Sequence, residues 1–416
     1  MSRSLRDVAA RVDLLLGQLG PALDGTGPAL RVAPLPPGAA HRAADEAAGE
    51  PDHVPDDVAL VVATSGSTGE PRSVLLTGAA LRTSARATEQ RLSGPGRWLL
   101  ALPVDHVAGL QVLVRSQLAG TRPAVLADGP FTAAAFTQAA RSMADDAHEP
   151  EVPRYVSLVP TQLVRVLDDP AATVAARAFD AILLGGAATP GPVLDRARDA
   201  GLRVVTTYGM TETCGGCVYD GVPLDGVRVL LDDEGRVLLG GEVLAAGYLG
   251  RPDLDVAAFV EIDGTRFLRT SDLGRLEHGR LTVLGRADDV VVTGGVNVAP
   301  AAVEAALATM PGIAEALVTG VPDDEWGQAV AALVVLDGAA GTSPVGLEAV
   351  RAHVTRALGA PCAPRHLLVV EALPLRGPGK PDRRTARSLV EAHLAPSRPT
   401  TTRSTRPQPL SPRSPA

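Results

Sequence analysis

Nine consecutive residues, 64–72, combine hydroxyl side chains with glycines and end on a cation. Glycine lets a backbone approach a polyphosphate closely, and hydroxyl and N–H groups donate hydrogen bonds to phosphate oxygens. The segment is not a Walker loop, because a proline stands where the second glycine of that motif is required. It predicts a phosphate-binding loop of another kind, the alternative being an ordinary Ser/Gly turn. Its members are Thr64, Ser65, Gly66, Ser67, Thr68, Gly69, Glu70, Pro71 and Arg72.

A second segment, residues 207–213, brings together an aromatic ring, a glycine and a carboxylate. Like the first segment, it directly follows an apolar stretch of strand length. Ligands of an open α/β sheet lie beyond the carboxyl ends of its strands. The two segments are therefore expected to share one crevice. The candidate residues of the second are Tyr208, Gly209, Thr211 and Glu212.

Lys380 is the only lysine among 39 basic residues. Arginine and lysine are interchangeable at many surface positions, but a site that needs a compact, movable ammonium requires lysine. The composition alone leaves two interpretations open: Lys380 is a catalytic lysine, or it is a lysine that has been retained by chance.

The remaining candidates are cysteines and one histidine. Cys214 and Cys217 form a C-x-x-C, which a redox dithiol or half of a zinc site would also show. No second C-x-x-C and no nearby histidine completes a metal site, so small residues that shape a pocket are the preferred interpretation. His106 lies in a Pro-Val-Asp-His turn before a predicted helix, and it is the histidine in a motif-like setting.

The elements that position these residues are predicted to alternate between strands and helices. This alternation predicts a largely parallel sheet with helices on its faces. Strands are expected at 58–63, 98–102, 124–126, 155–159, 181–184 and 203–206, with helices at 5–19, 79–91 and 107–119.

The pattern of predicted secondary structure changes twice after this region. Residues 226–292 read as short strands between Gly- and Asp-rich turns, which favours an antiparallel or barrel-like subregion. A compact α/β unit follows, with a helix expected at 299–310, strands at 315–320, 330–336 and 367–370, and a helix at 345–358. The predicted organisation is an N-terminal domain at 1–285, a hinge at 286–289, a C-terminal domain at 290–394 and a disordered tail at 395–416.

Charge and composition exclude several classes of protein. With 47 acidic and 39 basic residues and no basic block, the chain is a poor binder of nucleic acid or anionic membranes. No apolar run approaches the roughly 20 residues that cross a bilayer, and charged residues interrupt the N-terminus where a signal peptide needs an apolar stretch. Three cysteines make no disulfide framework. A cytoplasmic protein is predicted, and a homo-oligomer is left open.

Six motifs in order resemble the signature of the adenylate-forming superfamily, which includes acyl-CoA synthetases, peptide-synthetase adenylation domains and luciferases. The resemblance covers roughly residues 55–392. It implies an α/β fold with a large N-terminal domain of doubly wound, mostly parallel sheets, a small barrel-like β subregion and a small mobile C-terminal domain. The motifs are Thr64–Arg72, Tyr208–Glu212, Ser271–Gly274, Gly285–Asp289, Gly294-Gly295 and Gly377–Lys380.

Two further segments, His106–Leu110 and Gly215–Leu224, resemble the short actinobacterial 2-succinylbenzoate–CoA ligases of menaquinone biosynthesis. The resemblance implies adenylation of a small carboxylic acid with ATP and Mg²⁺, followed by thioester formation with coenzyme A. Other interpretations stay open: a ligase for another aryl or fatty acid, a stand-alone domain that loads a carrier protein, or an inactive nucleotide-binding regulator.

The resemblance also implies roles for individual residues at the nucleotide. Residues 64–69 would hold the ATP phosphates, with Arg72 in place of the usual lysine, and Glu212 would be linked to Mg²⁺. Asp272 would accept the ribose hydroxyls, with Arg286 nearby. The adenine would lie against Tyr208 and beside Gly185, Gly186 and Ala187, in a loop that includes Gly209 and Thr211.

The remaining implied roles concern catalysis and domain motion. Lys380 resembles the catalytic lysine of adenylation, and Glu212 and His106 are the other residues expected to take part in catalysis. His106 and Gly209 border the acyl site. Asp288 stands where the family places its hinge, and Gly294-Gly295 resembles the strip along which the pantetheine of coenzyme A passes.

Arg115 is the candidate for substrate choice. Succinylbenzoate has two carboxylates, one of which reacts, and the other needs a cationic or multi-donor partner if it is buried. Arg115 interrupts an apolar helix-like run that starts beside His106, and related ligases can carry a basic residue at this offset. We expect Arg115 to anchor the second carboxylate, the alternative being an arginine that faces solvent.

Overall fold

A seven-stranded sheet forms the centre of the N-terminal part of the computed structural model. The structure describes residues 8–32, 54–65, 71–127, 129–145, 152–337, 345–376 and 380–394, so the predicted tail at 395–416 lies outside it. The strand order is β10-β9-β8-β7-β6-β4-β5, and neighbouring strands run parallel from β8 to β5, as predicted. The strands are β4 (Arg97–Leu100), β5 (Ala124–Val125), β6 (Arg154–Leu158), β7 (Ala181–Leu184), β8 (Val204–Met210), β9 (Gly215–Tyr219) and β10 (Val222–Pro223).

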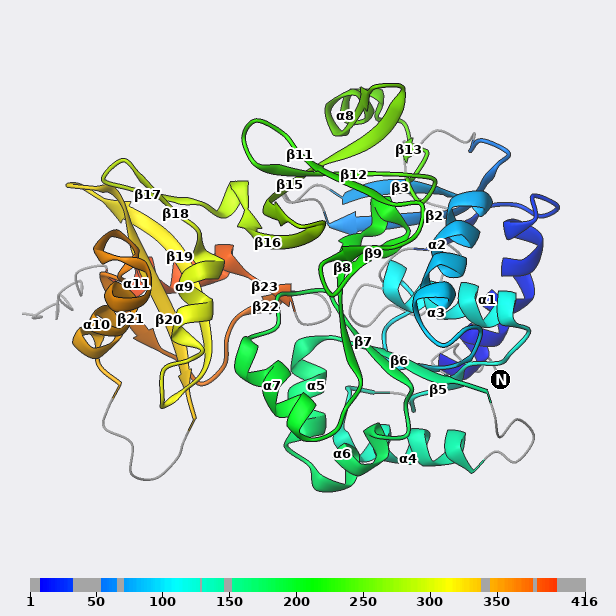
Figure 1. Ribbon diagram of the computed structural model, residues 1–416, viewed down its shortest axis with the longest axis horizontal. Coiled ribbons are helices and arrows are strands. Elements are labelled where there is room, and N and C mark those ends of the chain that lie inside the picture. Colours follow the sequence, from blue (N-terminus) through cyan, green and yellow to red (C-terminus); the bar gives the residue numbers. More distant parts are fainter. Residues whose placement is uncertain are drawn as a thin grey trace, which may run out of the picture.

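Helices cover both faces of this sheet (Figure 1). Successive strand residues point to opposite faces, so Leu183 packs with α1, α2 and α3 while Ile182 packs with α4 to α7. The sheet is therefore doubly wound. The helices are α1 (Val8–Leu23), α2 (Gly78–Arg91), α3 (Val107–Ala119), α4 (Ala133–Ala144), α5 (Pro160–Leu167), α6 (Pro170–Ala176) and α7 (Gly191–Asp199).

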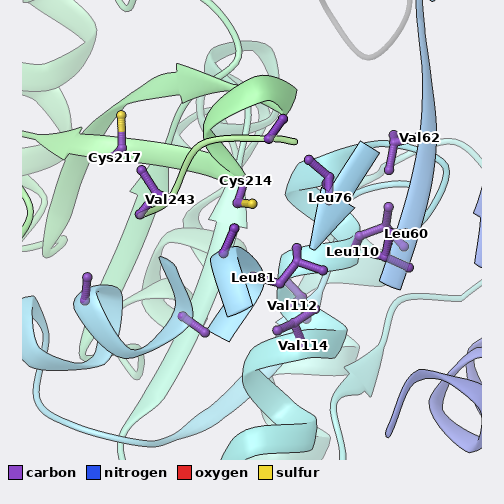
Figure 2. Packing of buried hydrophobic residues seen from close by; sticks show 14 of the residues in the cluster. Leu60, Val62, Leu76, Leu81, Leu110, Val112, Val114, Cys214, Cys217 and Val243 are labelled. Atoms are coloured by element: carbon purple, nitrogen blue, oxygen red, sulfur yellow. The ribbon is translucent and has the colours of Figure 1, made fainter. Parts of the chain in front are cut away.

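The expectation that the strand at 58–63 belongs to the parallel sheet is wrong. This strand is β2 (Val58–Ser65), which pairs antiparallel with β3 (Pro71–Thr77) in a separate four-stranded sheet. Figure 2 shows Leu60, Val62 and Leu76 of this sheet against apolar side chains of α2 and α3. The helices α2 and α3 are thus shared by two sheets. The other strands are β1 (Leu30–Val32) and β13 (Gly247–Tyr248).

The predicted antiparallel subregion is present as a third sheet. All of its neighbouring strands run antiparallel, and Asp272 of β15 pairs with Arg286 of β16. Its strands are β11 (Arg228–Leu231), β12 (Arg236–Gly240), β14 (Phe259–Ile262), β15 (Thr265–Glu277) and β16 (Arg280–Arg286), and α8 (Pro252–Ala258) lies beside it.

The C-terminal part has its own cores and stands apart from the rest in Figure 1. One core packs α9 and α10 on a five-stranded sheet, and the other packs α11 on the opposite face. The helix α11 was not predicted. The strands are β17 (Val291–Thr293), β18 (Val296–Val298), β19 (Ile313–Asp323), β20 (Gly327–Leu336) and β21 (His366–Val369), and the helices are α9 (Pro300–Leu307), α10 (Leu347–Leu358) and α11 (Arg383–Leu394).

Short elements complete the described chain. Single-turn 3₁₀ helices lie at η1 (Thr211–Thr213), η2 (Ala287–Asp289) and η3 (Ala360–Cys362). A two-stranded pair, β22 (Leu375–Arg376) and β23 (Lys380–Pro381), projects from the C-terminal part toward the N-terminal part (Figure 1). Among the described helices, none is both long and apolar enough to cross a bilayer.

Candidate active site

Tyr208, Asp272 and Arg286 come together from two different sheets. The Tyr208 hydroxyl donates a hydrogen bond of 2.7 Å to Asp272 Oδ2. Arg286 faces Asp272 across the β15–β16 pair. Burial raises the pKa of Tyr208, and the Asp272 carboxylate raises it further, so the phenol stays protonated. A ring, a carboxylate and a guanidinium therefore share one small region, which is the arrangement expected of the predicted nucleoside site.

The position of Tyr208 differs from the prediction of a loop after a strand. The strand β8 continues to Met210, because β9 turns back and pairs with residues 207–210. Tyr208 and Gly209 therefore lie on a strand and are held by its ladder. Only Thr211 and Glu212 lie in the turn that follows, in η1.

Two glycines near Tyr208 let neighbouring strands of the sheet pack closely at positions where a side chain would collide. A Cβ on Gly209 would lie 2.1 Å from the Gly215 carbonyl oxygen, and one on Gly185 would lie 2.4 Å from Thr207 Oγ1. Gly185, Gly186 and Ala187 follow β7 directly, beside β8. They thus border the strand that carries Tyr208, where the predicted adenine site places them.

We predict that Asp272→Ala chiefly weakens ATP binding. A carboxylate that accepts two ribose hydroxyls contributes hydrogen bonds worth about 1.5–3 kcal/mol, or roughly 10- to 150-fold in affinity. Calorimetric titration with ATP measures this loss directly. An unchanged ATP affinity with a lower melting temperature would assign Asp272 to strand structure instead.

Glu212 is held by a tyrosine that the sequence analysis missed. The Tyr248 hydroxyl on β13 donates a hydrogen bond of 2.9 Å to Glu212 Oε1. Burial raises the pKa of Tyr248, the Glu212 charge raises it further and Arg72 partly opposes this, so the hydroxyl remains a donor. The Arg72 guanidinium lies 5.9 Å from the centre of the Tyr248 ring. Tyr248 therefore joins the end of the 64–72 segment to Glu212.

This arrangement fits a magnesium ion shared with a phosphate ligand. Tyr248 occupies Oε1 of Glu212, which leaves the second carboxylate oxygen for a cation. Mg²⁺ in nucleotide sites takes one or two carboxylates and completes its shell with phosphate oxygens and water. Among the described residues no group of three or more His, Cys, Asp or Glu side chains is placed to hold a metal, so a lone Glu212 would share the ion with substrate.

Tyr248→Phe is expected to weaken Mg²⁺ binding in the presence of ATP by about 10-fold, since groups that orient a metal-ligating carboxylate contribute 10- to 100-fold to affinity. The magnesium dependence of ATP binding, followed by calorimetry, measures this without turnover. A normal magnesium dependence would show that the hydroxyl serves only packing.

His106 lies at the start of α3. It is the residue before the first turn, its side chain is 37% exposed and its Nε2 is 3.8 Å from Asp105 Oδ1. A Cβ on Gly109 would lie 2.1 Å from the Pro103 carbonyl oxygen, so the first turn packs tightly on the preceding loop. His106 is therefore a partly exposed imidazole on a fixed helix end.

Arg115 is buried, not exposed to solvent. Its exposed fraction is 3%, and its guanidinium carbon lies 4.8 Å from the centre of the Trp98 ring. Burial lowers the pKa of Arg115, whereas Tyr219 and Glu89 raise it. The Nε atom is buried and has no hydrogen-bond partner among the described residues. An N–H in this state is available to an anion or a water molecule.

Arg115 belongs to a polar layer between α2, α3 and β9. Glu89 of α2 also has a buried oxygen without a partner in the described part of the chain, and burial raises its pKa, against the effect of Arg115 and Arg86. The Tyr219 hydroxyl lies 3.0 Å from Thr88 Oγ1. One turn before Arg115, Gln111 donates a hydrogen bond of 2.7 Å to the Cys214 carbonyl. This layer continues from Arg115 to the turn that carries Glu212.

Cys214 and Cys217 are fully buried. Burial raises the pKa of both thiols, that of Cys217 to about 12, so neither is a thiolate near neutral pH. They lie among apolar side chains such as Val243 (Figure 2). The pair thus has the surroundings of packing residues.

Most of the other candidates lie in the hinge or in the C-terminal part. Asp288 is in η2 and Lys380 in β23, while residues 66–70 and 377–379 lie outside the described residues. Gly294 and Gly295 form the two-residue turn between β17 and β18, with φ of 56° and 79°. Positive φ at both positions is typical of a type I′ hairpin turn, which requires glycine or asparagine. Their structural role is therefore a turn, and a role toward coenzyme A is a proposal.

The sequence and the structure are similar to those of succinylbenzoate–CoA ligases. The relatives include a probable 2-succinylbenzoate–CoA ligase of Mycobacterium tuberculosis, 48% identical over 375 residues that span 89% of this chain and 93% of the relative. A 2-succinylbenzoate–CoA ligase of Bacillus cereus is 31% identical over 362 residues, with 81% and 71% covered. The o-succinylbenzoate CoA synthetase of Bacillus subtilis, solved with its acyl-adenylate intermediate, superposes with a TM-score of 0.66 at 29% identity, with 79% and 69% covered.

Family models cover both parts of the chain. Residues 20–249 match the AMP-binding enzyme family, and residues 302–380 match the C-terminal domain of AMP-binding enzymes. The fold described above is that of the adenylate-forming enzymes. The chain therefore belongs to the family of AMP-binding enzymes, as the ordered motifs predict.

Proposed function

We propose that this protein is a 2-succinylbenzoate–CoA ligase that forms AMP. Two relatives at 48% and 31% identity carry this name. The observation in this chain that supports the substrate is Arg115, a buried cation on α3 whose Nε has no hydrogen-bond partner among the described residues. Arg115 lies nine positions after His106, which is about 14 Å along the helix at 1.5 Å per residue. We assign Arg115 the role of holding the second carboxylate of the acid, directly or through water.

Adenylation is the first step of the proposed reaction. An oxygen of the succinyl carboxylate attacks the α-phosphorus of ATP, the bond to the bridging oxygen breaks and pyrophosphate leaves. The reaction brings anions together, so positioned cations stabilise it. Tyr208, Asp272 and Arg286 would hold the nucleoside, and Lys380 would lie on the α-phosphate. Mg²⁺, held by Glu212, would supply charge neutralisation at the phosphates.

Thioester formation is the second step. The sulfur of coenzyme A attacks the acyl carbonyl carbon, the bond to the AMP oxygen breaks, and the thiol proton goes to solvent. Lys380 has no role in this step, and a thiol must reach the carbonyl in its place. A rotation of the C-terminal part about the hinge would meet both needs with one site.

The separation of the hydrophobic cores on the two sides of the hinge supports this rotation. We assign residues 1–285 to the N-terminal domain, 286–289 to the hinge and 290–394 to the mobile C-terminal domain. The core clusters of the described residues contain members either from 12–281 or from 291–390, never from both. Few apolar side chains therefore need to separate when the parts rotate.

Pyrophosphate release against a panel of acids tests the proposal. With ATP and Mg²⁺, we expect release that depends on 2-succinylbenzoate and becomes multiple-turnover when coenzyme A is added. A preference for a mono-acid would favour a ligase for another acid. Acid-dependent release without turnover on coenzyme A would favour loading of a carrier protein, and no release with any acid would favour an inactive paralogue.

A further inference from the structure

Two neighbouring aspartates in the hinge form ion pairs on opposite sides of it. Asp288 Oδ2 accepts a hydrogen bond of 3.0 Å from Arg286 Nη2, where β16 ends and the hinge begins. Asp289 Oδ2 accepts one of 2.9 Å from Arg383 Nε, at the start of α11 in the C-terminal part. The contact of Asp288 therefore lies on the β16 side of the hinge, and the contact of Asp289 lies on the α11 side.

All three nitrogens of the Arg383 guanidinium donate hydrogen bonds. Besides Asp289, the guanidinium donates from Nη2 to Glu304 Oε2 at 3.1 Å, from Nη1 to Glu304 Oε1, and from Nη1 to the Val318 carbonyl at 3.0 Å. Glu304 Oε1 in turn accepts from the Val318 N–H at 2.8 Å. The hinge residue Asp289, the helices α9 and α11 and the strand β19 are therefore joined by one planar cation. We call Arg383, Asp289 and Glu304 the Arg383 network.

This network is shielded enough to fix geometry. The exposed fractions of the Arg383, Glu304 and Asp289 side chains are 20%, 18% and 29%. Bidentate pairing of a guanidinium with a carboxylate fixes orientation as well as distance. A surface pair such as Arg387–Glu391 on the same helix, with both side chains more than 40% exposed, lacks this constraint.

The network lies next to the strand that carries Lys380. Only Pro381 and Asp382 separate Lys380 from Arg383, and the Asp382 N–H donates to the Pro374 carbonyl at 2.9 Å, beside β22. The start of α11 and the β22–β23 pair are thus joined by the backbone. Whatever fixes Arg383 relative to the hinge also fixes the base of the Lys380 strand.

We infer that Arg383 is a positioning residue for adenylation. By binding Asp289, it confines rotation to the peptide units before Asp289. The end of the hinge and the strand that carries Lys380 then move as one rigid unit. This inference rests on the proposed function, in which Lys380 acts on the α-phosphate. A displacement of about 1 Å at a reacting group can reduce a rate by about 10²-fold, so a rigid connection between hinge and lysine has a direct catalytic consequence.

Asp289→Asn tests the inference with little risk to the fold. It removes one of two carboxylates and leaves Arg383 paired with Glu304, whereas a change at Arg383 would leave both carboxylates unpaired. We expect adenylation, measured by ATP–pyrophosphate exchange, to fall by about 10- to 100-fold. Transfer from supplied acyl-adenylate to coenzyme A should change much less. Arg387→Gln, which breaks only the exposed pair on α11, serves as the matched control and should leave both half-reactions unchanged.

The same substitution in a Lys380→Ala background separates positioning from general damage. If Asp289 acts through the lysine, Asp289→Asn should cause no further loss of exchange once Lys380 is absent. An equal loss in both backgrounds, or no loss in either, would overturn the inference. Normal exchange in Lys380→Ala alone would instead contradict the proposed role of the lysine, so the two failures are distinguishable.

Discussion

Replacing Lys380 with alanine is expected to reduce adenylation to a small residual rate while the second half-reaction survives. Removal of one positioned electrostatic group costs a reaction about 10²- to 10³-fold in rate, and this lysine would be the principal cation on the α-phosphate. Thioester formation from supplied acyl-adenylate should continue, because no charge accumulates on phosphate in that step. Stopped-time assays of pyrophosphate release and of thioester formation measure the two rates separately.

Lys380→Arg provides the control for charge. A guanidinium keeps the positive charge but is a wide planar fork, so we expect it to restore only part of the adenylation rate. ATP-dependent turnover at a nearly normal rate in Lys380→Ala would contradict the assignment.

Replacing Arg115 with leucine is expected to raise the KM for 2-succinylbenzoate by roughly 30- to 4,000-fold, because loss of one partner of a buried charged pair costs about 2–5 kcal/mol. The KM for ATP should change little, since Trp98, Glu89 and Tyr219, and not the nucleoside residues, surround Arg115. Steady-state kinetics with each substrate varied in turn gives both constants.

A mono-acid analogue without the ring carboxylate is the matched control for Arg115. It has no anion for Arg115 to bind, so Arg115→Leu should affect it far less. Arg115→Lys, which retains the charge, should recover part of the affinity for 2-succinylbenzoate. If both acids lose equally, Arg115 stabilises the layer between α2, α3 and β9 and does not anchor substrate.

Local elements were predictable where periodicity and end signals agree. The helix at 107–119 has the predicted bounds, because an apolar run ends at Gly120, which adopts a left-handed conformation with φ of 66°. The strand at 181–184 also has the predicted bounds, since all four of its residues are buried. An arginine on a helix that is apolar on most sides is buried with the helix, which accounts for Arg115.

Pairings between distant segments were not predictable. The extension of β8 through Tyr208 depends on β9, and the placement of β2 in a separate sheet depends on β3 and β13. Neither pairing leaves a periodic pattern in the strand itself, because strand length and sheet membership are set by the partner.

The same limit applies to the candidate site. Tyr248 reaches Glu212, and Arg383 reaches Asp289, only through tertiary contacts across 36 and 94 residues of sequence. One signal for Tyr248 was present in the composition. The chain has only four tyrosines, and each of them uses its hydroxyl in a hydrogen bond. A rare aromatic residue with a polar end is a good candidate for a buried polar contact.

The most direct test of the whole account is the product stoichiometry of the wild-type reaction. The protein is incubated with 2-succinylbenzoate, ATP, Mg²⁺ and coenzyme A, and the products are separated and identified by mass spectrometry. We expect equal amounts of 2-succinylbenzoyl-CoA, AMP and pyrophosphate, with the succinyl carboxylate carrying the thioester. Formation of ADP and phosphate, or consumption of ATP without a thioester of this acid, would contradict it.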